Sequence, residues 1–127
     1  MIKDRFKFRA WNKKERIMHY KAEQTYDTFT GSPRIWKQSF SDVLDDENYI
    51  VEQCTGIKDK NGKFVFEGDV VFINGEKWCV IWSDEDCAFF FSNLKEVYHQ
   101  PIFPDYYAMA SDFEVIGNIH ENPELMK

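Results

Sequence analysis

The chain has 127 residues, 17% of them aromatic and 30% charged, which suits one folded globular domain and excludes a disordered chain. No apolar run reaches the length of about 18 residues that a membrane-spanning helix needs, and the first residues lack the apolar region of a signal peptide. We therefore expect a cytoplasmic protein without membrane contact, and the net charge of -6 argues against binding nucleic acid over the whole surface.

The first predicted element is a β-hairpin over residues 5–20. The stretch "RFKFRAW", residues 5–11, alternates basic and apolar side chains, and a period of two over a short run is typical of a half-buried strand. The polar "NKKER" that follows predicts a turn, and "IMHY" can return as the antiparallel partner strand.

Basic residues are concentrated at this end of the chain. Residues 1–40 hold ten Lys or Arg against four Asp or Glu, a charge of +6, whereas residues 41–127 hold six against eighteen, a charge of -12. Basic side chains beside an aromatic ring could follow a nucleic-acid backbone and stack a base. The candidate contacts to nucleic acid or to a partner are Arg5, Lys7, Arg9, Trp11, Lys13 and Lys14. The alternative, which we favour, is that the two halves neutralise each other in the fold.

The connector at residues 22–48 carries few structural signals. "TGSP" marks a turn, and "SFSDVLDDE" predicts one or two helical turns with Ser39 or Ser41 as the N-cap. The strand pattern then resumes in "YIVEQCTG".

The middle of the chain reads as short strands joined by tight turns. Asn61-Gly62 and Asn74-Gly75 predict two hairpin turns, because Asn and Gly both tolerate a positive φ. Gly68-Asp69 predicts a bend or bulge. A last strand is expected in "DFEVIGNI", residues 112–119, and Pro123 suits the first position of a short helical turn. Such a series favours a small antiparallel barrel or sandwich.

Two of these strands, in "KWCVIW" and "CAFFF", are apolar on both faces. A strand buried on one face should alternate apolar and polar residues, so either the N-terminal segment or a second subunit must cover the outer face. The sequence also offers aromatic residues for a protein contact or a homo-oligomer, namely Tyr98, Phe103, Tyr106 and Tyr107. An ordinary large core covered by the N-terminal half explains the pattern equally well.

No motif indicates a cofactor, a metal site or an enzyme. The three cysteines suit reduced core thiols, and they show neither CxxC spacing nor an HExxH partner motif. With a turn at residues 83–86, Trp82 would face Cys87 and Cys79 would face Phe90, so these two thiols would not be cross-strand neighbours.

Two weaker chemical patterns also have structural explanations. "TGIKDKNGK" is not a P-loop, because Lys63 leads into a strand. Asp59, Glu67 and Asp69 could supply an acid and a base, but turns need Asp and Gly for backbone reasons. They remain candidates for a partner contact near the bend, and we expect a protein that is not an enzyme and binds no cofactor.

Three blocks of the sequence resemble the YopX family of phage and prophage proteins, in both order and spacing: "KFRAW", "TGIKDKNGKFVFEGDVV" and "FEVIGNIHENPEL". The resemblance implies a phage-encoded protein with an all-β fold that includes an SH3-like barrel, and it supplies no activity and no catalytic residue. We therefore predict a single all-β domain over residues 1–127. It consists of an N-terminal hairpin and connector at 1–52, a small antiparallel SH3-like barrel at 53–119 and a C-terminal turn at 120–127.

The function expected from the sequence is a phage or prophage accessory protein that binds another, unknown protein or itself. The alternative is a nucleic-acid-binding small barrel that uses the basic N-terminal strand. A hydrolase with paired carboxylates is the third and most distant hypothesis.

Overall fold

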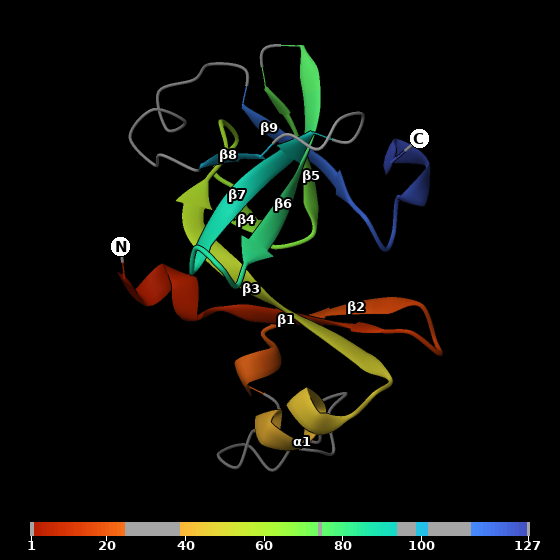
Figure 1. Cartoon of the computed structure of the whole chain (residues 1–127). Helices are drawn as coiled ribbons and strands as arrows, with labels where there is room; N and C mark the ends of the chain where they lie inside the picture. Colours follow the sequence, from red (N-terminus) through yellow and green to blue (C-terminus); the bar gives the residue numbers. More distant parts are fainter. Residues whose placement is uncertain (1, 25–38, 74, 94–98, 102–112, 127) are drawn as a thin grey trace.

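A computed structural model describes residues 2–24, 39–73, 75–93, 99–101 and 113–126, and its strands form two antiparallel sheets (Figure 1). The first sheet has four strands in the order β2-β1-β3-β4, and the second has five in the order β8-β7-β6-β5-β9. The strands are β1 (Phe8–Asn12), β2 (Ile17–Tyr20), β3 (Tyr49–Lys58), β4 (Phe64–Phe66), β5 (Asp69–Ile73), β6 (Glu76–Ser83), β7 (Ala88–Asn93), β8 (His99–Pro101) and β9 (Glu114–Asn118). The helices are η1 (Ile2–Phe6), η2 (Ala22–Gln24), α1 (Phe40–Asp45) and η3 (Pro123–Met126).

The predicted all-β fold with an N-terminal hairpin is confirmed. The second sheet curls into a half-barrel, and the hairpin of β1 and β2 lies against it in the first sheet (Figure 1). The strand β3 pairs with β1 through its first half and with β4 through its second half. The predicted boundary between residues 52 and 53 therefore falls inside a continuous strand.

The N-terminal strand is shorter than its sequence pattern predicts. Residues Ile2–Phe6 form a 3-10 helix, and β1 begins only at Phe8. Within the strand, both Arg9 and Ala10 are fully buried, although they lie on opposite faces. One face packs with Val43 of α1 and Ala22 of η2, and the other faces the second sheet. The prediction of a half-buried strand was wrong because both faces of β1 are covered.

The helix in the connector is confirmed, with Ser39 as its N-cap. The Ser39 hydroxyl accepts a hydrogen bond from the Asp42 N–H at 3.1 Å, and the Asp42 carboxylate accepts one from the Ser39 N–H at 3.3 Å. This reciprocal pair is a capping box, which fixes where a short helix begins. Residues 25–38 of the connector, and the predicted turn in them, lie outside the described residues.

The predicted turns at glycine also form. Gly62 has a φ of +81° in the loop that joins β3 to β4. The strands β5 and β6 form a hairpin at Gly75, whose φ is +83°, and Asn74 lies outside the described residues. Gly68 has a φ of +87° and stands where the chain leaves the first sheet and enters the second. The predicted bend at Gly68-Asp69 is therefore the junction between the two sheets. The short C-terminal turn predicted at Pro123 is present as η3.

The predicted register of β6 with β7 was wrong by two residues. Trp82 pairs with Phe89 and Cys79 with Ser92, since the turn extends through Cys87, whose φ is +51°. The Ser83 hydroxyl contacts the Asp86 carboxylate at 3.0 Å within this turn. Cys79 and Cys87 are still not cross-strand neighbours. The expectation of core thiols is confirmed for Cys54 and Cys79, which are buried, and was wrong for Cys87, which is exposed.

Among the described residues, the larger apolar cluster belongs mainly to the curled sheet. Its buried members are Val65, Val71, Ile73, Trp78, Val80, Phe91, Phe113 and Val115. The outer face of β6 is covered in part by the first sheet, because Cys79 is buried beside the charges of Glu52 and Asp69. Trp82 lies on the opposite face, the face of the core residues Trp78 and Val80, and remains 41% exposed toward the end of the strand. The aromatic residues expected at a partner surface, Tyr98, Phe103, Tyr106 and Tyr107, lie outside the described residues.

Candidate functional site

Two features lie where the hairpin meets the rest of the molecule, and both include candidate residues from the sequence. The first is a buried charge cluster, formed by Arg9, Glu52, Asp69 and His120. The second is a lysine pocket of about 350 Å³, lined by Lys7, Phe8, Tyr20, Lys21, Glu23, Gln24, Lys63, Phe64 and Phe66.

The charge cluster is centred on Arg9, which is only 1% exposed. Its Nε donates to Glu52 Oε1 at 2.9 Å, and its Nη1 donates to Asp69 Oδ1 at 2.7 Å. Its Nη2 donates to the carbonyl of Glu67 at 3.0 Å. Arg9 comes from β1, Glu52 from β3 and Asp69 from β5, so the guanidinium links the two sheets. A buried guanidinium with this many partners serves as a structural joint, that is, it holds the two sheets together through ion pairs and hydrogen bonds.

The cluster continues to the C-terminal end of the chain. The second oxygen of Glu52 lies 2.9 Å from His120 Nε2, and the His120 ring stacks on Trp11 at 5.3 Å. Gly68 packs directly against the Glu52 carboxylate, which a Cβ at that position would overlap. The Glu52 side chain is therefore fixed from three sides.

Burial and neighbouring charges together shift the pKa values of Arg9 and of the two buried cysteines. Burial by itself would lower the pKa of Arg9, but Asp69 and Glu52 outweigh it and raise that pKa, so the guanidinium stays charged. Burial also raises the pKa of Cys79 to about 12 and, to a smaller degree, that of Cys54. Thiols with raised pKa values are poor nucleophiles, so neither buried cysteine is suited to covalent catalysis.

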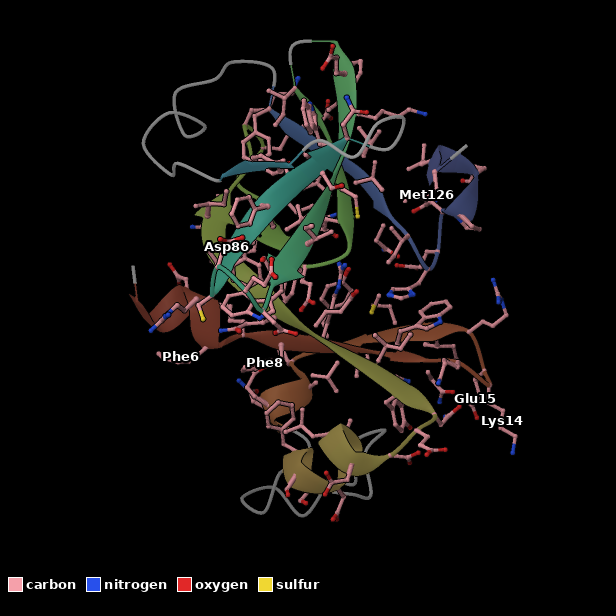
Figure 2. The ribbon with its side chains drawn as sticks, viewed as in Figure 1. Phe6, Phe8, Lys14, Glu15, Asp86 and Met126 are labelled. Atoms are coloured by element: carbon pink, nitrogen blue, oxygen red, sulfur yellow. The ribbon has the colours of Figure 1, made fainter. Side chains whose placement is uncertain are left out.

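The basic residues predicted to share one surface do not do so. Arg9 and Trp11 are buried, and a buried guanidinium cannot reach a phosphate backbone. Arg5 lies in η1 with its guanidinium over the Phe6 ring, and Lys13 and Lys14 are exposed in the turn after β1. Figure 2 shows Lys14 and Phe6 at opposite ends of the hairpin region. The expectation of a continuous basic strand face was wrong, and of its members only Lys7 lines the pocket.

The favoured alternative, neutralisation of the basic half by the acidic half, is confirmed for Arg9. Its carboxylate partners Glu52 and Asp69 both come from residues 41–127. Arg9 and Asp69 were candidates for two separate contact surfaces, but in the fold they form an ion pair with each other.

The three acidic candidates near the bend have separate roles. Asp59 is buried, and its carboxylate accepts hydrogen bonds from the N–H groups of Asn61 and Lys63 at 2.9 Å and of Val115 at 3.0 Å. It thus fixes the β3–β4 loop and ties it to β9. Asp69 belongs to the charge cluster, so Asp59 and Asp69 do not converge on one site.

Glu67 is the candidate with the least compensated charge. Its carboxyl is half-buried, and burial raises its pKa, which a long hydrogen bond of 3.4 Å from the Gln53 N–H partly offsets. Glu67 lines a smaller hollow of about 200 Å³, which we call the Trp82 groove. The other lining residues are Phe8, Leu44, Val51, Gln53, Trp82 and Phe89.

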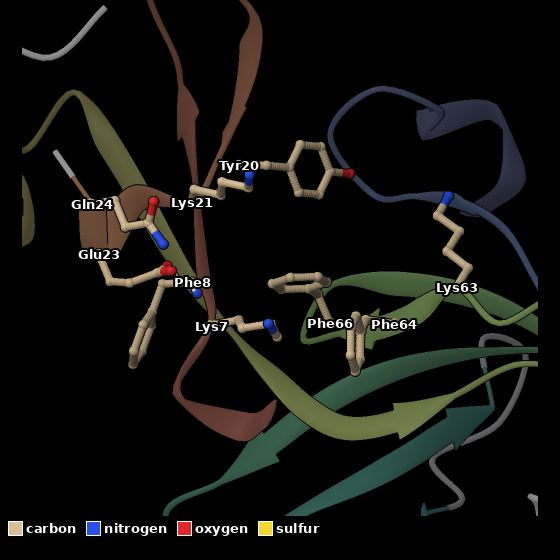
Figure 3. Close-up of a pocket in the computed structure, with 9 residues that line it drawn as sticks. All are labelled: Lys7, Phe8, Tyr20, Lys21, Glu23, Gln24, Lys63, Phe64 and Phe66. Carbon is tan, nitrogen blue, oxygen red and sulfur yellow. Dashed lines mark hydrogen bonds between the residues drawn. The ribbon is translucent and has the colours of Figure 1, made fainter. Parts of the chain in front are cut away.

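The lysine pocket lies between the hairpin and β4 (Figure 3). Lys7 and Lys21 approach it from the hairpin side, and Lys63 stands on the opposite side, with Tyr20, Phe64 and Phe66 between them. Three lysines against Glu23 leave a formal charge of +2 on the lining residues. The pocket therefore combines an aromatic floor with a positive rim on a chain whose net charge is -6.

Cations already lie over three of the aromatic rings. The ammonium groups of Lys7 and Lys58 lie 5.1 and 4.9 Å from the centre of the Phe64 ring. The guanidinium of Arg9 lies 5.0 Å from the centre of the Phe66 ring and 5.9 Å from that of the Tyr20 ring. Tyr20 meets Phe66 edge-to-face at 5.8 Å. These contacts hold the pocket walls in place before any ligand binds.

Lys21 has an unusual backbone. Its φ of +57° lies in the left-handed region, which costs a residue with a Cβ about 1 kcal/mol. It stands between β2 and η2, where Glu23 Oε1 accepts a hydrogen bond from the Phe8 N–H at 2.9 Å. That bond ties η2 to β1, and the Lys21 side chain reaches into the pocket (Figure 3).

Sequence reasoning missed most of this pocket. Lys21, Lys63, Phe64 and Tyr20 come from segments far apart in the chain, and only the fold assembles them. One weak signal exists, since Lys63 and Phe64 follow the glycine-rich stretch "TGIKDKNG", whose pattern is compared above with a P-loop. Glu52 also carried a signal, as an acidic residue directly after the apolar run "YIV" at the start of its strand.

The described residues also bear on metal-binding clusters and on helices that could span a membrane. Among the residues that the structure describes, no group of three or more His, Cys, Asp or Glu side chains is placed to hold a metal ion. Within the same ranges, no helix has the length and apolar character needed to cross a bilayer.

Comparison with known proteins supports the family resemblance. The family model described as YopX protein matches residues 7–127. The crystal structure of protein EF1440 from Enterococcus faecalis has a TM-score of 0.66 and 26% sequence identity, over 95% of this chain and 97% of that chain. No curated protein matches. The family match covers nearly the whole chain, and this protein therefore belongs to the YopX family.

Proposed function

We propose that this protein is a non-enzymatic accessory protein of a phage or prophage, and that it acts by binding another protein through the lysine pocket. The observation that carries the proposal is the pocket itself, about 350 Å³ with an aromatic floor and a positive rim. Pockets of this kind are the usual places where proteins hold their ligands. The charge cluster next to it serves the fold, which leaves the pocket as the better candidate site.

The proposal is tested by affinity capture from lysate of an induced host. The bait variant Lys7→Glu/Lys63→Glu reverses two charges at the pocket, and the matched control Lys13→Glu/Lys14→Glu reverses two charges in the exposed β1–β2 turn. Both double variants change the net charge equally. We expect a host or phage protein that the wild type and the control capture and that the pocket variant does not. Equal capture by all three baits would contradict the proposal.

Nucleic-acid binding is the second candidate, supported by one observation. Lys7, Lys21 and Lys63 surround the pocket, and their ammonium groups could contact the phosphates of a single-stranded nucleic acid. Tyr20 beside them is 47% exposed, so its ring could contact one base. Fluorescence anisotropy with single- and double-stranded DNA at about 50 mM salt, where phosphate contacts are strongest, tests it. The charge variant Arg5→Glu/Lys7→Glu avoids the buried Arg9. DNA binding that this variant loses would support the second candidate.

We further infer that residues 53–119, which include the curled second sheet, form an SH3-like barrel, that the protein works in the host cytoplasm, and that it can self-associate. Self-association is supported by apolar side chains that remain exposed, such as Leu44 at 55% and Trp82 at 41%. Size-exclusion chromatography with light scattering tests it, and a strict monomer at micromolar concentration would contradict it.

A further inference from the structure

We propose that the lysine pocket recognises an acidic segment of a partner protein that carries one bulky apolar side chain. The apolar side chain lies on the floor of Tyr20, Phe64 and Phe66, and the flanking carboxylates pair with the lysines of the rim. This inference rests on the proposed function and names the kind of partner that the pocket fits.

Charge complementarity is the first argument. The pocket lining carries +2 although the chain as a whole carries -6, so an acidic ligand is attracted at this site and repelled elsewhere on the acidic surface. The one carboxylate in the lining, Glu23, already accepts a hydrogen bond from the Phe8 N–H. The rim therefore selects against basic segments and in favour of acidic ones.

The floor supplies the second argument. Phe66 is buried and Phe64 half-buried, and together with the exposed Tyr20 they give the pocket an apolar base. A volume of about 350 Å³ lies at the small end of ligand pockets, which run from about 300 to 1,000 Å³. That space suits one large side chain of an extended segment, since a single anchored side chain surrounded by charged contacts is a common mode of recognition.

The type of cation supplies the third argument. The rim holds lysines, whose ammonium groups are mobile point charges that pair with carboxylates in many orientations. Lys21 is held at a φ of +57° at the mouth of the pocket, a backbone strain that a glycine would avoid. A lysine at this strained position is explained if its ammonium is needed there.

The same contacts disfavour a nucleic acid in this pocket. Single strands bind by stacking bases on free aromatic faces. The Phe64 ring already has the ammonium groups of Lys7 and Lys58 over it, and Phe66 has the guanidinium of Arg9. An apolar side chain can pack against the edges and uncovered parts of these rings, whereas a stacked base needs a whole open face.

The experiment selects peptides from a displayed library of random sequences, with the wild-type protein as bait. Enriched peptides are synthesised with a fluorescent label, and their affinities are measured by anisotropy for the wild type and three variants. Lys7→Glu/Lys63→Glu disrupts the rim, Lys13→Glu/Lys14→Glu is the control with equal charge change, and Lys21→Gly removes one rim ammonium while it relieves the backbone strain. A folded Lys21→Gly keeps the test valid if the double variant does not fold.

We expect enriched peptides to be rich in Asp and Glu around one Phe, Tyr, Trp or Leu. Replacement of that residue by Ala should weaken binding about tenfold or more, because burial of a large apolar side chain carries most of the affinity. Lys7→Glu/Lys63→Glu should weaken binding about tenfold and Lys21→Gly a few-fold, since each exposed ion pair contributes modestly. The control should bind like the wild type.

Several outcomes would overturn the inference. One is enrichment of peptides without acidic residues or without a dependence on the pocket lysines, and another is no enrichment at all. Displacement of the peptide by single-stranded oligothymidylate would favour nucleic acid as the ligand. If the capture experiment still yields a protein that requires Lys7 and Lys63, the proposed function stands and only this description of the partner fails. If capture also fails, both fail.

Discussion

Lys7 directly precedes β1 and Arg9 lies two residues farther along, within that strand, yet the two side chains belong to different environments. Arg9 is 1% exposed and donates hydrogen bonds to two strands of different sheets, through Glu52 and Asp69. Lys7, in contrast, lies at the rim of an open pocket with its ammonium over an aromatic ring. The difference arises because the second sheet covers the chain at Arg9 and leaves it open at Lys7, just before β1 begins. Periodicity along a strand determines which face a side chain takes, but only tertiary packing decides how deep it lies.

The largest expected effect comes from substituting these two residues in the same way. Arg9→Met keeps the length of the side chain but leaves the buried carboxylates of Glu52 and Asp69 without a cation, so we expect a loss of about 3–5 kcal/mol in the free energy of unfolding. Lys7→Met should change it by less than about 0.5 kcal/mol, as is usual for a surface position. Urea denaturation of both variants measures the difference. A loss below about 1 kcal/mol for Arg9→Met would mean that the charge cluster is not a structural joint.

The rigidity of the cluster can be tested at the glycine that contacts it. Gly68 and Gly62 have similar φ values, +87° and +81°, so Ala costs about 1–2 kcal/mol at either position from the backbone alone. A Cβ at Gly62 meets no atom within 4 Å, whereas one at Gly68 overlaps the Glu52 carboxylate. Because Arg9 and His120 hold that carboxylate, we expect Gly68→Ala to cost at least about 1 kcal/mol more than Gly62→Ala. Equal losses in thermal denaturation would show that Glu52 moves aside easily.

A smaller effect is expected where the cluster reaches the C-terminal turn. His120→Phe keeps a ring to stack on Trp11 but removes the 2.9 Å contact to Glu52, so we expect a loss of about 1–2 kcal/mol in unfolding free energy. Met126→Ala, an exposed change in the nearby η3, serves as the control and should cost less than about 0.5 kcal/mol. If His120→Phe costs no more than the control, the C-terminal turn is not anchored through Glu52.

The parts of the fold that were predictable depend on local chemistry. The turn at Asn61-Gly62 and the bend at Gly68 follow from backbone conformations that few residues adopt, and the helix start at Ser39 follows from the capping side chain. The burial of Arg9 and the register of Cys79 were not predictable, because both depend on which segments pack together. A short alternating run such as residues 5–11 has the same pattern on a half-buried and on a fully covered strand.

The candidate site was harder to predict than the fold. Lys7 was among the candidate residues, but its partners Lys21, Lys63 and Phe64 lie in segments that no local pattern connects. The acidic residue Asp59 was a candidate only because turns and binding sites both use Asp, and its three backbone hydrogen bonds show the former use. A residue type that suits two purposes can be assigned to one of them only once its neighbours are known.

The smallest expected effect concerns Glu67, whose carbonyl joins the charge cluster through Arg9 while its side chain stays outside it. Burial raises the pKa of this carboxyl, so the folded protein holds its proton more tightly than the unfolded chain does. As the pH rises through the range between the ordinary and the raised pKa, the folded protein must give up that proton, and the contribution of Glu67 to stability falls. Glu67→Gln does not titrate, so its stability relative to the wild type should increase between about pH 4 and pH 7 in urea denaturation. Glu85→Gln removes one charge from the exposed β6–β7 turn and corrects for the change in net charge. If the difference in unfolding free energy between wild type and Glu67→Gln stays constant with pH, the Glu67 carboxyl is effectively solvated, unlike those of Glu52 and Asp69. The boundary of the buried region would then lie between Glu67 and Asp69.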